Sequence, residues 1–154
     1  MVISAVVLLL IGATLQAAPA AKDLDREQLL QREREKLEKE TDPIDRAKIG
    51  IKISEILLDD VGDCVREGNF AEMEEQLDAY GETIQTAHQS LIDSGRNASK
   101  KSNGFKELEI ALRKHAQKFE EFGRMLNLQR RVPVEKAKDI AVAVRNKLLK
   151  AMFP

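Results

Sequence analysis

The chain has 154 residues, 33% of them charged, and its formal net charge is −1. Cys64 is the only cysteine, which excludes an intramolecular disulfide, and there is no Trp among the few aromatic residues. A domain of this length must therefore be stabilised by the packing of mainly aliphatic side chains.

The first 20 residues have the pattern of a secretory signal peptide. No charged side chain occurs between Val2 and Leu15, and Ala18-Pro19-Ala20 is the small-x-small sequence after which signal peptidases cut. The apolar run is shorter than a membrane span, which needs about 20 apolar residues. We therefore expect residues 1–20 to be removed and the protein to be periplasmic or extracellular. Because no Lys or Arg precedes the apolar run, an uncleaved segment that anchors the protein in a membrane is the alternative.

Residues 21–42 form a second segment, which is strongly charged. It is rich in strong helix formers, but Leu24, Leu29, Leu30 and Leu37 are its only large apolar residues. We predict a solvated N-terminal helix that docks weakly on the remainder of the protein.

Residues 43–154 are predicted to form a helical bundle whose helix ends are marked by capping residues. Asp42 followed by Pro43 predicts a helix start, and Gly68 predicts a left-handed helix end. The polar segment 96–104 is the one long loop. The predicted helices run from Pro43 to about Glu67, from Phe70 to about Asp93, from Phe105 to about Asn127, and from just after Pro133 nearly to the last residue.

Apolar residues in these four helices recur at alternating steps of three and four, the seam pattern of helices that pack knobs-into-holes. No segment alternates with period two, so no strand is predicted. We expect an all-α fold, an antiparallel four-helix bundle of two helical hairpins preceded by the charged helix and the signal peptide. The seams are Ile44, Ala47, Ile51, Ser54, Leu58, Val61 and Val65; Phe70, Met73, Leu77, Tyr80, Ile84, Ala87 and Leu91; Phe105, Leu108, Leu112, His115, Phe119, Phe122 and Leu126; and Val134, Ala137, Ala141, Val144, Leu148 and Ala151.

The turn Gly68-Asn69-Phe70, with the following Met73, Leu77 and Tyr80, resembles the middle of a tetratricopeptide-type helical hairpin. The resemblance covers about one repeat, lacks the glycine of the first helix and the closing proline, and does not recur, whereas a solenoid needs at least about three repeats. The chain as a whole is similar to small exported bacterial helical proteins. These resemblances imply a helical hairpin and no particular activity.

Neither a metal site nor a cofactor site is predicted. His115 lies on a seam, but His88 lies beside a seam on another helix, and a metal site in a bundle needs several inward ligands. We therefore interpret His115 as a core residue. Asp59, Asp63 and Glu67 follow one another at steps of four, but one helix cannot surround a cation, so we interpret them as a solvated acidic face.

A catalytic centre is not predicted either, and we expect the protein not to be an enzyme. Cys64 adjoins the carboxylate of Asp63, which raises rather than lowers the pKa of a thiol. Neither a Ser/His/Asp set nor a glycine-rich phosphate loop can be assembled. Asn97-Ala98-Ser99 has the form of an N-glycosylation site in a loop.

Charge is distributed unevenly along the chain. Residues 1–95 contain 10 basic and 20 acidic side chains, and residues 96–154 contain 15 basic and 6 acidic ones. The acidic first hairpin and the basic second hairpin attract each other in one interpretation; in the other, the basic side chains bind an anionic partner. Nucleic acid is not the expected anion, because the basic half has no aromatic platform for bases. The candidate anion-binding residues are Lys100, Lys101, Lys106, Arg113, Lys114, Arg130 and Arg131.

The helix that begins at Pro43 has apolar residues outside its seam. Ile49, Ile53, Ile56 and Leu57 lie where a surface helix of a bundle should be polar. Either the leucines of the N-terminal helix cover this strip, or a binding partner does.

These patterns together favour an exported, non-enzymatic protein that acts by binding another protein, by self-association or as a structural element. The alternative is a binder of anionic envelope polymers or lipid headgroups through the basic second hairpin. A small-molecule substrate is not expected.

The signal-peptide interpretation predicts that the exported protein begins at Ala21. N-terminal sequencing or the intact mass of the exported form measures this directly. Recovery of the full-length chain in the membrane fraction would contradict cleavage.

Overall fold

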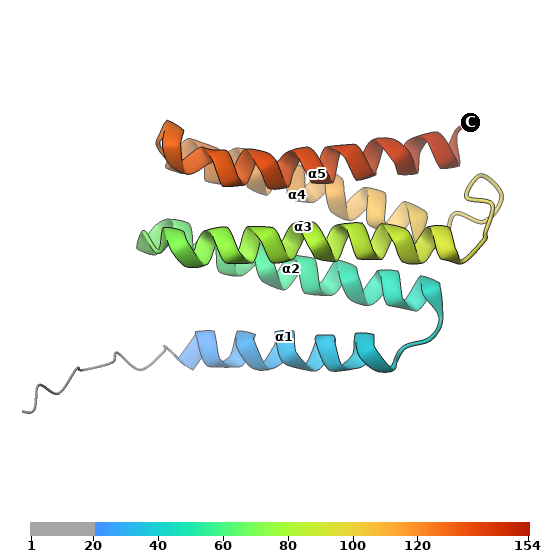
Figure 1. Ribbon diagram of the computed structural model, residues 1–154, viewed down its shortest axis with the longest axis horizontal. Coiled ribbons are helices and arrows are strands. Elements are labelled where there is room, and N and C mark those ends of the chain that lie inside the picture. Colours follow the sequence, from blue (N-terminus) through green and yellow to red (C-terminus); the bar gives the residue numbers. More distant parts are fainter. Residues whose placement is uncertain (1–20) are drawn as a thin grey trace, which may run out of the picture.

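The computed structural model describes residues 21–154, which form five helices and no strand (Figure 1). The expected all-α class is therefore confirmed, whereas the predicted signal peptide, residues 1–20, lies outside the described residues. The helices are α1 (Ala21–Lys39), α2 (Pro43–Glu67), α3 (Phe70–Asp93), α4 (Phe105–Met125) and α5 (Leu128–Met152).

Both ends of α2 have the caps that the sequence predicted. The side chain of Asp42 accepts hydrogen bonds from the backbone N–H groups of Ile44 and Asp45, at 2.9 and 3.0 Å. These bonds satisfy donors that the first turn of a helix cannot pair internally. At the other end, Gly68 has φ +75°, the left-handed conformation that a residue without Cβ adopts at little cost.

The start of α5 differs from the prediction. The helix begins at Leu128 rather than after Pro133, because Asn127 caps it by accepting a hydrogen bond of 3.0 Å from the N–H of Arg130. Pro133 lacks only the N–H that would bond the carbonyl of Gln129, so it weakens one turn without ending the helix.

Helices α2, α3, α5 and α4 contact one another in a ring: α2 packs on α3, α3 on α5, α5 on α4, and α4 on α2. Among the described residues, α2 and α5 do not contact each other, as expected of helices on a diagonal. Helix α1 lies outside the ring and contacts α2 (Figure 1). The turns α2–α3 and α4–α5 and the first residues of α1 lie at one end of the molecule, opposite the 94–104 loop (Figure 1).

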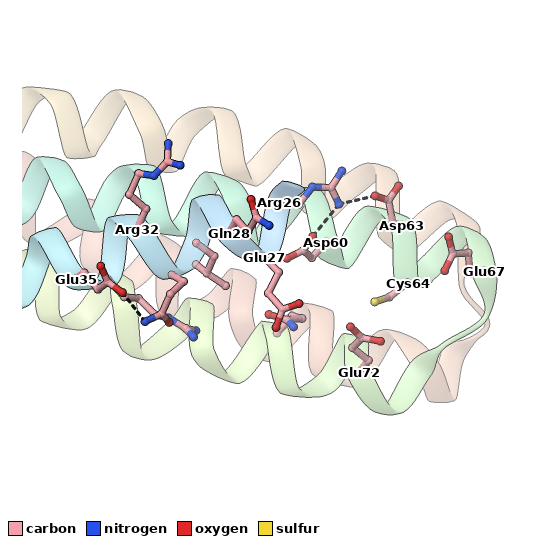
Figure 2. A pocket seen from close by; sticks show the side chains of 14 residues that line it. Arg26, Glu27, Gln28, Arg32, Glu35, Asp60, Asp63, Cys64, Glu67 and Glu72 are labelled. Atoms are coloured by element: carbon pink, nitrogen blue, oxygen red, sulfur yellow. Dashed lines mark hydrogen bonds and ion pairs between the residues drawn. The ribbon is translucent and has the colours of Figure 1, made fainter. Parts of the chain in front are cut away.

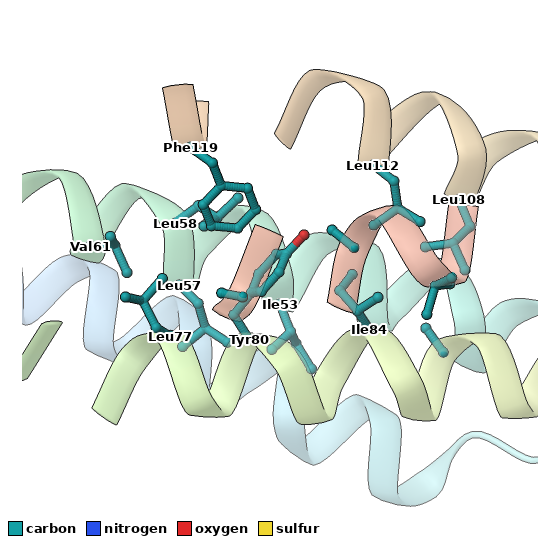
Figure 3. Close-up of a cluster of buried hydrophobic side chains, with 14 of the residues drawn as sticks. Ile53, Leu57, Leu58, Val61, Leu77, Tyr80, Ile84, Leu108, Leu112 and Phe119 are labelled. Carbon is teal, nitrogen blue, oxygen red and sulfur yellow. The ribbon is translucent and has the colours of Figure 1, made fainter. Parts of the chain in front are cut away.

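The predicted seams form the core. Leu58, Leu77, Tyr80, Leu112 and Phe119 are buried and gather between the helices of the ring (Figure 3). The rings of Tyr80 and Phe119 meet edge to face with their centroids 5.3 Å apart, a favourable arrangement for aromatic pairs. The seams are least buried at Ile51 and Phe70, which are half-buried, and at Ala151, which is exposed.

Truncation of a seam leucine should destabilise the protein strongly. We expect Leu77→Ala and Leu112→Ala each to lower the free energy of unfolding by about 2–5 kcal/mol, because each leaves a cavity in the core. The exposed Glu75→Ala should change it by less than about 0.5 kcal/mol. Denaturant unfolding measures all three, and equally small effects would contradict the core assignment.

Candidate binding surface

One face of α2 turns toward α1. This face is marked by Arg46 near the start of α2 and by Asp60 and Asp63 near its end, all of which bond α1. The steps of three and four from Arg46 lead through Ile49, Ile53 and Ile56 to Asp60 and Asp63, so all six residues lie on one side of the helix. We call these residues, Arg46, Ile49, Ile53, Ile56, Asp60 and Asp63, the α1-facing stripe.

Charged groups fix both ends of the contact. The guanidinium of Arg26 donates to a carboxylate oxygen of Asp60 at 2.7 Å and to one of Asp63 at 2.5 Å (Figure 2). At the other end, the guanidinium of Arg46 donates to the backbone carbonyls of Leu37 and Glu40, both at 2.8 Å. Leu37 lies in the last turn of α1 and Glu40 directly follows the helix, where carbonyls lack partners within the helix.

The pKa values of Arg26 and Asp60 are shifted in the contact. Burial works against the charge of Arg26, but the hydrogen bonds to Asp60 and Asp63 outweigh it and raise the pKa of Arg26. Burial also raises the pKa of Asp60, an effect that the neighbouring Arg26 opposes. The acidic face predicted to be solvated is therefore partly covered, because α1 supplies a cation to it. Asp59, on another side of α2, pairs with Lys118 of α4 at 2.5 Å.

Helix α1 contributes few buried apolar side chains to its contact with α2. Leu30 is buried in the same hydrophobic cluster as Ile53, and Leu37, Ile49 and Ile56 are partly buried against that cluster. In contrast, Leu29 is 46% exposed. The expected covering of the strip by α1 is thus made mainly by two leucines.

A buried carboxylate lies among these apolar groups. Glu33 is on the same side of α1 as Leu30 and Leu37, and only 9% of it is exposed. One of its oxygens pairs with Lys36, whereas the other, Oε2, has no hydrogen-bond partner among the residues that the structure describes. A buried oxygen without a partner costs free energy, so α1 is an imperfect cover for the α1-facing stripe.

The four residues predicted as a partner-binding strip do not form one surface. Leu57 is fully buried and Ile53 is 2% exposed, whereas Ile49 and Ile56 are half-buried. The prediction treated α2 as a peripheral helix, but α2 contacts α1, α3 and α4. Leu57 is therefore a core residue of the ring, and Ile49, Ile53 and Ile56 form the part that α1 faces.

A cleft of about 1050 Å³ adjoins the contact between α1 and α2 (Figure 2). Cys64 borders it, but burial first, and then the carboxylates of Glu72, Asp60 and others, raise the pKa of its thiol to about 11. The thiol is therefore protonated at neutral pH, which disfavours nucleophilic chemistry. The lining is of mixed charge: Arg26, Glu27, Gln28, Leu30, Gln31, Arg32, Arg34, Glu35, Asp60, Asp63, Cys64, Glu67, Glu72 and Gln76.

His115 is enclosed in the core, as expected of a seam residue. Its Nδ1 is hydrogen-bonded to the hydroxyl of Tyr80 at 3.0 Å, and its Nε2 has no partner in the described part of the chain. Burial, with smaller effects of Lys118 and Lys114, lowers the pKa of His115 to about 4. Across residues 21–154, no three His, Cys, Asp or Glu side chains are grouped as metal ligands would be.

The predicted anion-binding residues are spread along the length of the molecule. Lys100 and Lys101 lie in the 94–104 loop, and Arg130 and Arg131 lie in the first turns of α5, beyond the opposite end of α4. The 21 residues of α4 separate these groups by about 30 Å. Lys106, Arg113 and Lys114 lie along α4 and are exposed.

The contacts of the basic residues also differ. Arg113 is 3.7 Å from Glu109, Arg131 donates to the carbonyl of Leu126 at 2.8 Å, and the guanidinium of Arg130 lies 4.5 Å from the ring centre of Phe70. Among residues 21–154, no ion pair involves Lys100, Lys101, Lys106 or Lys114. The structure thus does not bring the seven residues into one patch.

Sequence reasoning expected the leucines of α1 to cover the strip, but it missed the charged residues Arg26 and Glu33 that lie at the same helix face. Arg26, Leu30, Glu33 and Leu37 follow steps of four, three and four, which is the same seam pattern as in the other helices. Because two of the four are charged, the pattern is invisible in the apolar residues alone. A search for charged pairs at seam positions of α1 and α2 would have found it.

Comparison of the chain with known protein families, curated proteins and solved structures found no match. Within residues 21–154, no helix is both long and apolar enough to cross a membrane.

The buried histidine should make the protein less stable in mild acid. Above pH 6.5 His115 is neutral in the folded and unfolded states; as the pH falls toward 4, only the unfolded state takes up the proton. Between pH 7 and pH 5 this group should lower the free energy of unfolding by about 2 kcal/mol. Denaturant unfolding at both pH values should show a smaller loss for His115→Gln, whose side chain does not titrate. An equal loss in both proteins would show that His115 is not the cause.

Proposed function

We propose that this protein is an exported, non-enzymatic binding protein whose docking site is the α1-facing stripe. In this proposal α2–α5 form an antiparallel four-helix bundle of two hairpins, and α1 is a displaceable fifth helix. The partner supplies a helix that replaces α1, and it is either another protein or a second copy of this chain. The ring of contacts among α2, α3, α5 and α4 supports the bundle arrangement.

The observation that carries the proposal is the mismatch between the two sides of the α1–α2 contact. The α1-facing stripe has three isoleucines between its charged ends. On the opposite side of the contact, α1 contributes Leu30 and Leu37, with the buried carboxylate of Glu33 between them. A helix with apolar residues at all three central positions would bury more apolar surface there. Each fully buried aliphatic side chain is worth about 1.5–3 kcal/mol, so such a helix can compete with α1.

The free energy that holds α1 on α2 is also small enough for a partner to displace it. Its two anchoring ion pairs share Arg26 and are only 14–22% exposed, so the cost of taking these charges out of water offsets much of their attraction. Within the described residues, α2 is the one helix whose backbone lies close to α1, so α1 can leave without opening the ring. Elements with few buried apolar contacts are the first to open in native proteins.

A binding role fits the state of the residues that could carry chemistry. The thiol of Cys64 is kept protonated, and His115 is enclosed among core side chains away from solvent. The alternative, binding of anionic envelope polymers or headgroups along the whole basic hairpin, is less well supported because its residues are spread over about 30 Å.

Adjacent leucines on α1 allow a matched test of the proposal. Leu30 is 7% exposed and Leu29 is 46% exposed, so Leu30→Asp should release α1 whereas Leu29→Asp should not. We expect amide hydrogen exchange in α1 to rise at least about tenfold in Leu30→Asp alone, since releasing the helix lowers its opening free energy by more than about 1.4 kcal/mol.

The docking site is then tested by a labelled peptide of residues 21–40. It should bind Leu30→Asp saturably and bind the wild-type chain and Leu29→Asp much more weakly, because there α1 occupies the stripe. A crosslinker at Ile49 should report the same site, with the exposed Glu75 as the control position. If α1 is released and neither the peptide nor a second copy occupies the stripe, the docking proposal is wrong.

A further inference from the structure

The turn between α4 and α5 exposes large apolar side chains. Met125 is 57% exposed, Leu128 is 80% exposed and Val132 is 66% exposed. Leu128 and Val132 are four residues apart on α5 and therefore share one side of the helix. We call Met125, Leu128 and Val132 the apolar tip.

The exposure of the apolar tip is fixed by the local structure. The side chain of Asn127 caps α5, and Arg131 donates to the carbonyl of Leu126 across the turn at 2.8 Å. Leu126 itself points inward and is 5% exposed. With Leu126 filling the core position, the residues of the apolar tip have no space inside the bundle.

Arginines surround the apolar tip. Arg124, Arg130 and Arg131 lie within the segment 122–134, which contains no Asp or Glu. The α2–α3 turn at the same end carries Glu67 and Glu72. Glu120, Glu121 and Glu135 flank this segment, so the excess of positive charge is local to the residues of the α4–α5 turn.

The size of the apolar tip favours a lipid surface over a second copy of the chain. Three side chains at these exposures present on the order of 400 Å², about half of what each partner buries in a stable protein interface. A bilayer needs no matching surface, because apolar side chains enter the boundary of the acyl chains while arginines bind phosphates.

The path of the chain points to the same end. Helix α1 begins at Ala21 at the end of the molecule that carries the α4–α5 turn (Figure 1). The residues before Ala21 are the apolar run of the sequence. If that run acts as the signal peptide or anchor that the sequence predicts, it brings this end of the protein to a membrane surface.

We propose that the apolar tip inserts into the surface of an anionic membrane while Arg124 and Arg130 bind lipid phosphates. The tip lies on the opposite hairpin from the α1-facing stripe, so this inference does not depend on the proposed function. It would hold the protein upright on the membrane, with the 94–104 loop farthest from the lipid.

The absence of Trp from the chain permits a direct test with single reporters. Leu128→Trp places a tryptophan in the apolar tip, and Ile92→Trp places one at the opposite end, where Ile92 is 50% exposed. Variants of the chain that begins at Ala21, the expected start of the exported protein, are mixed with vesicles of phosphatidylcholine, with and without phosphatidylglycerol. We expect a blue shift and quenching by brominated acyl chains in Leu128→Trp with the anionic vesicles only, and neither in Ile92→Trp.

Binding to the same vesicles tests the side chains themselves. The double variant Leu128→Ser/Val132→Ser should bind roughly tenfold more weakly, and Arg124→Gln roughly fivefold more weakly at low salt. The matched controls at the other end, Ile92→Ser and Lys100→Gln/Lys101→Gln, should bind like the wild-type chain. Every protein begins at Ala21, so the lipid affinity of the apolar run in residues 1–20 does not enter the comparison.

The proposal fails if both tryptophans respond alike or neither responds, since the tip would then not be the inserted part. It fails if the serine variant binds as the wild type does, or if neutral and anionic vesicles bind equally. Concentration-dependent dimers that the serine variant abolishes, without any response to lipid, would assign the tip to a second copy of the chain instead.

Discussion

Helix α2 is enclosed by α1, α3 and α4, and the positions of the other helices depend on this. A helix covered on three sides needs apolar or paired side chains around most of its circumference. That requirement explains Leu57, which fills the core of the ring, and the isoleucines that α1 faces. It also explains why Asp60 and Asp63 are tolerated there, because α1 brings Arg26 to them.

The contact between α1 and α2 combines a weak apolar centre with polar ends. Ion pairs that remain partly solvated add little stability, but they fix the register and direction of the helix. Arg26 at one end and Arg46 at the other allow only one alignment of α1 along α2. With Glu33 incompletely paired between them, α1 is well positioned and weakly held, which is the combination that a replaceable cover requires.

The uneven charge of the chain is used in two ways. Lys118 pairs with Asp59, and Lys136 with Asp78 at 2.8 Å, so the basic hairpin meets the acidic one at two places. These pairs are exposed and orient the hairpins more than they stabilise them. The remaining basic groups lie apart from each other, and the arginines beside the α4–α5 turn adjoin exposed apolar side chains. The membrane proposal is therefore confined to that corner of the molecule.

The sequence by itself determined the helices, their caps and most of the core, because helix formation and capping depend on neighbouring residues and the seams repeat at a fixed step. Leu112 and Phe119 could be placed in the core for that reason. The start of α5 could not be predicted in this way. Pro133 suggested that the helix begins after it, whereas the helix begins at Leu128 because Asn127 caps it. Only the tertiary structure decided that α2 is an inner helix, that Arg26 reaches Asp60 and Asp63, and that the basic residues separate. Those outcomes depend on which helices become neighbours and on the register in which they pack. Arg26 and Asp60 are 34 positions apart in the chain, so no local sequence pattern indicates either property.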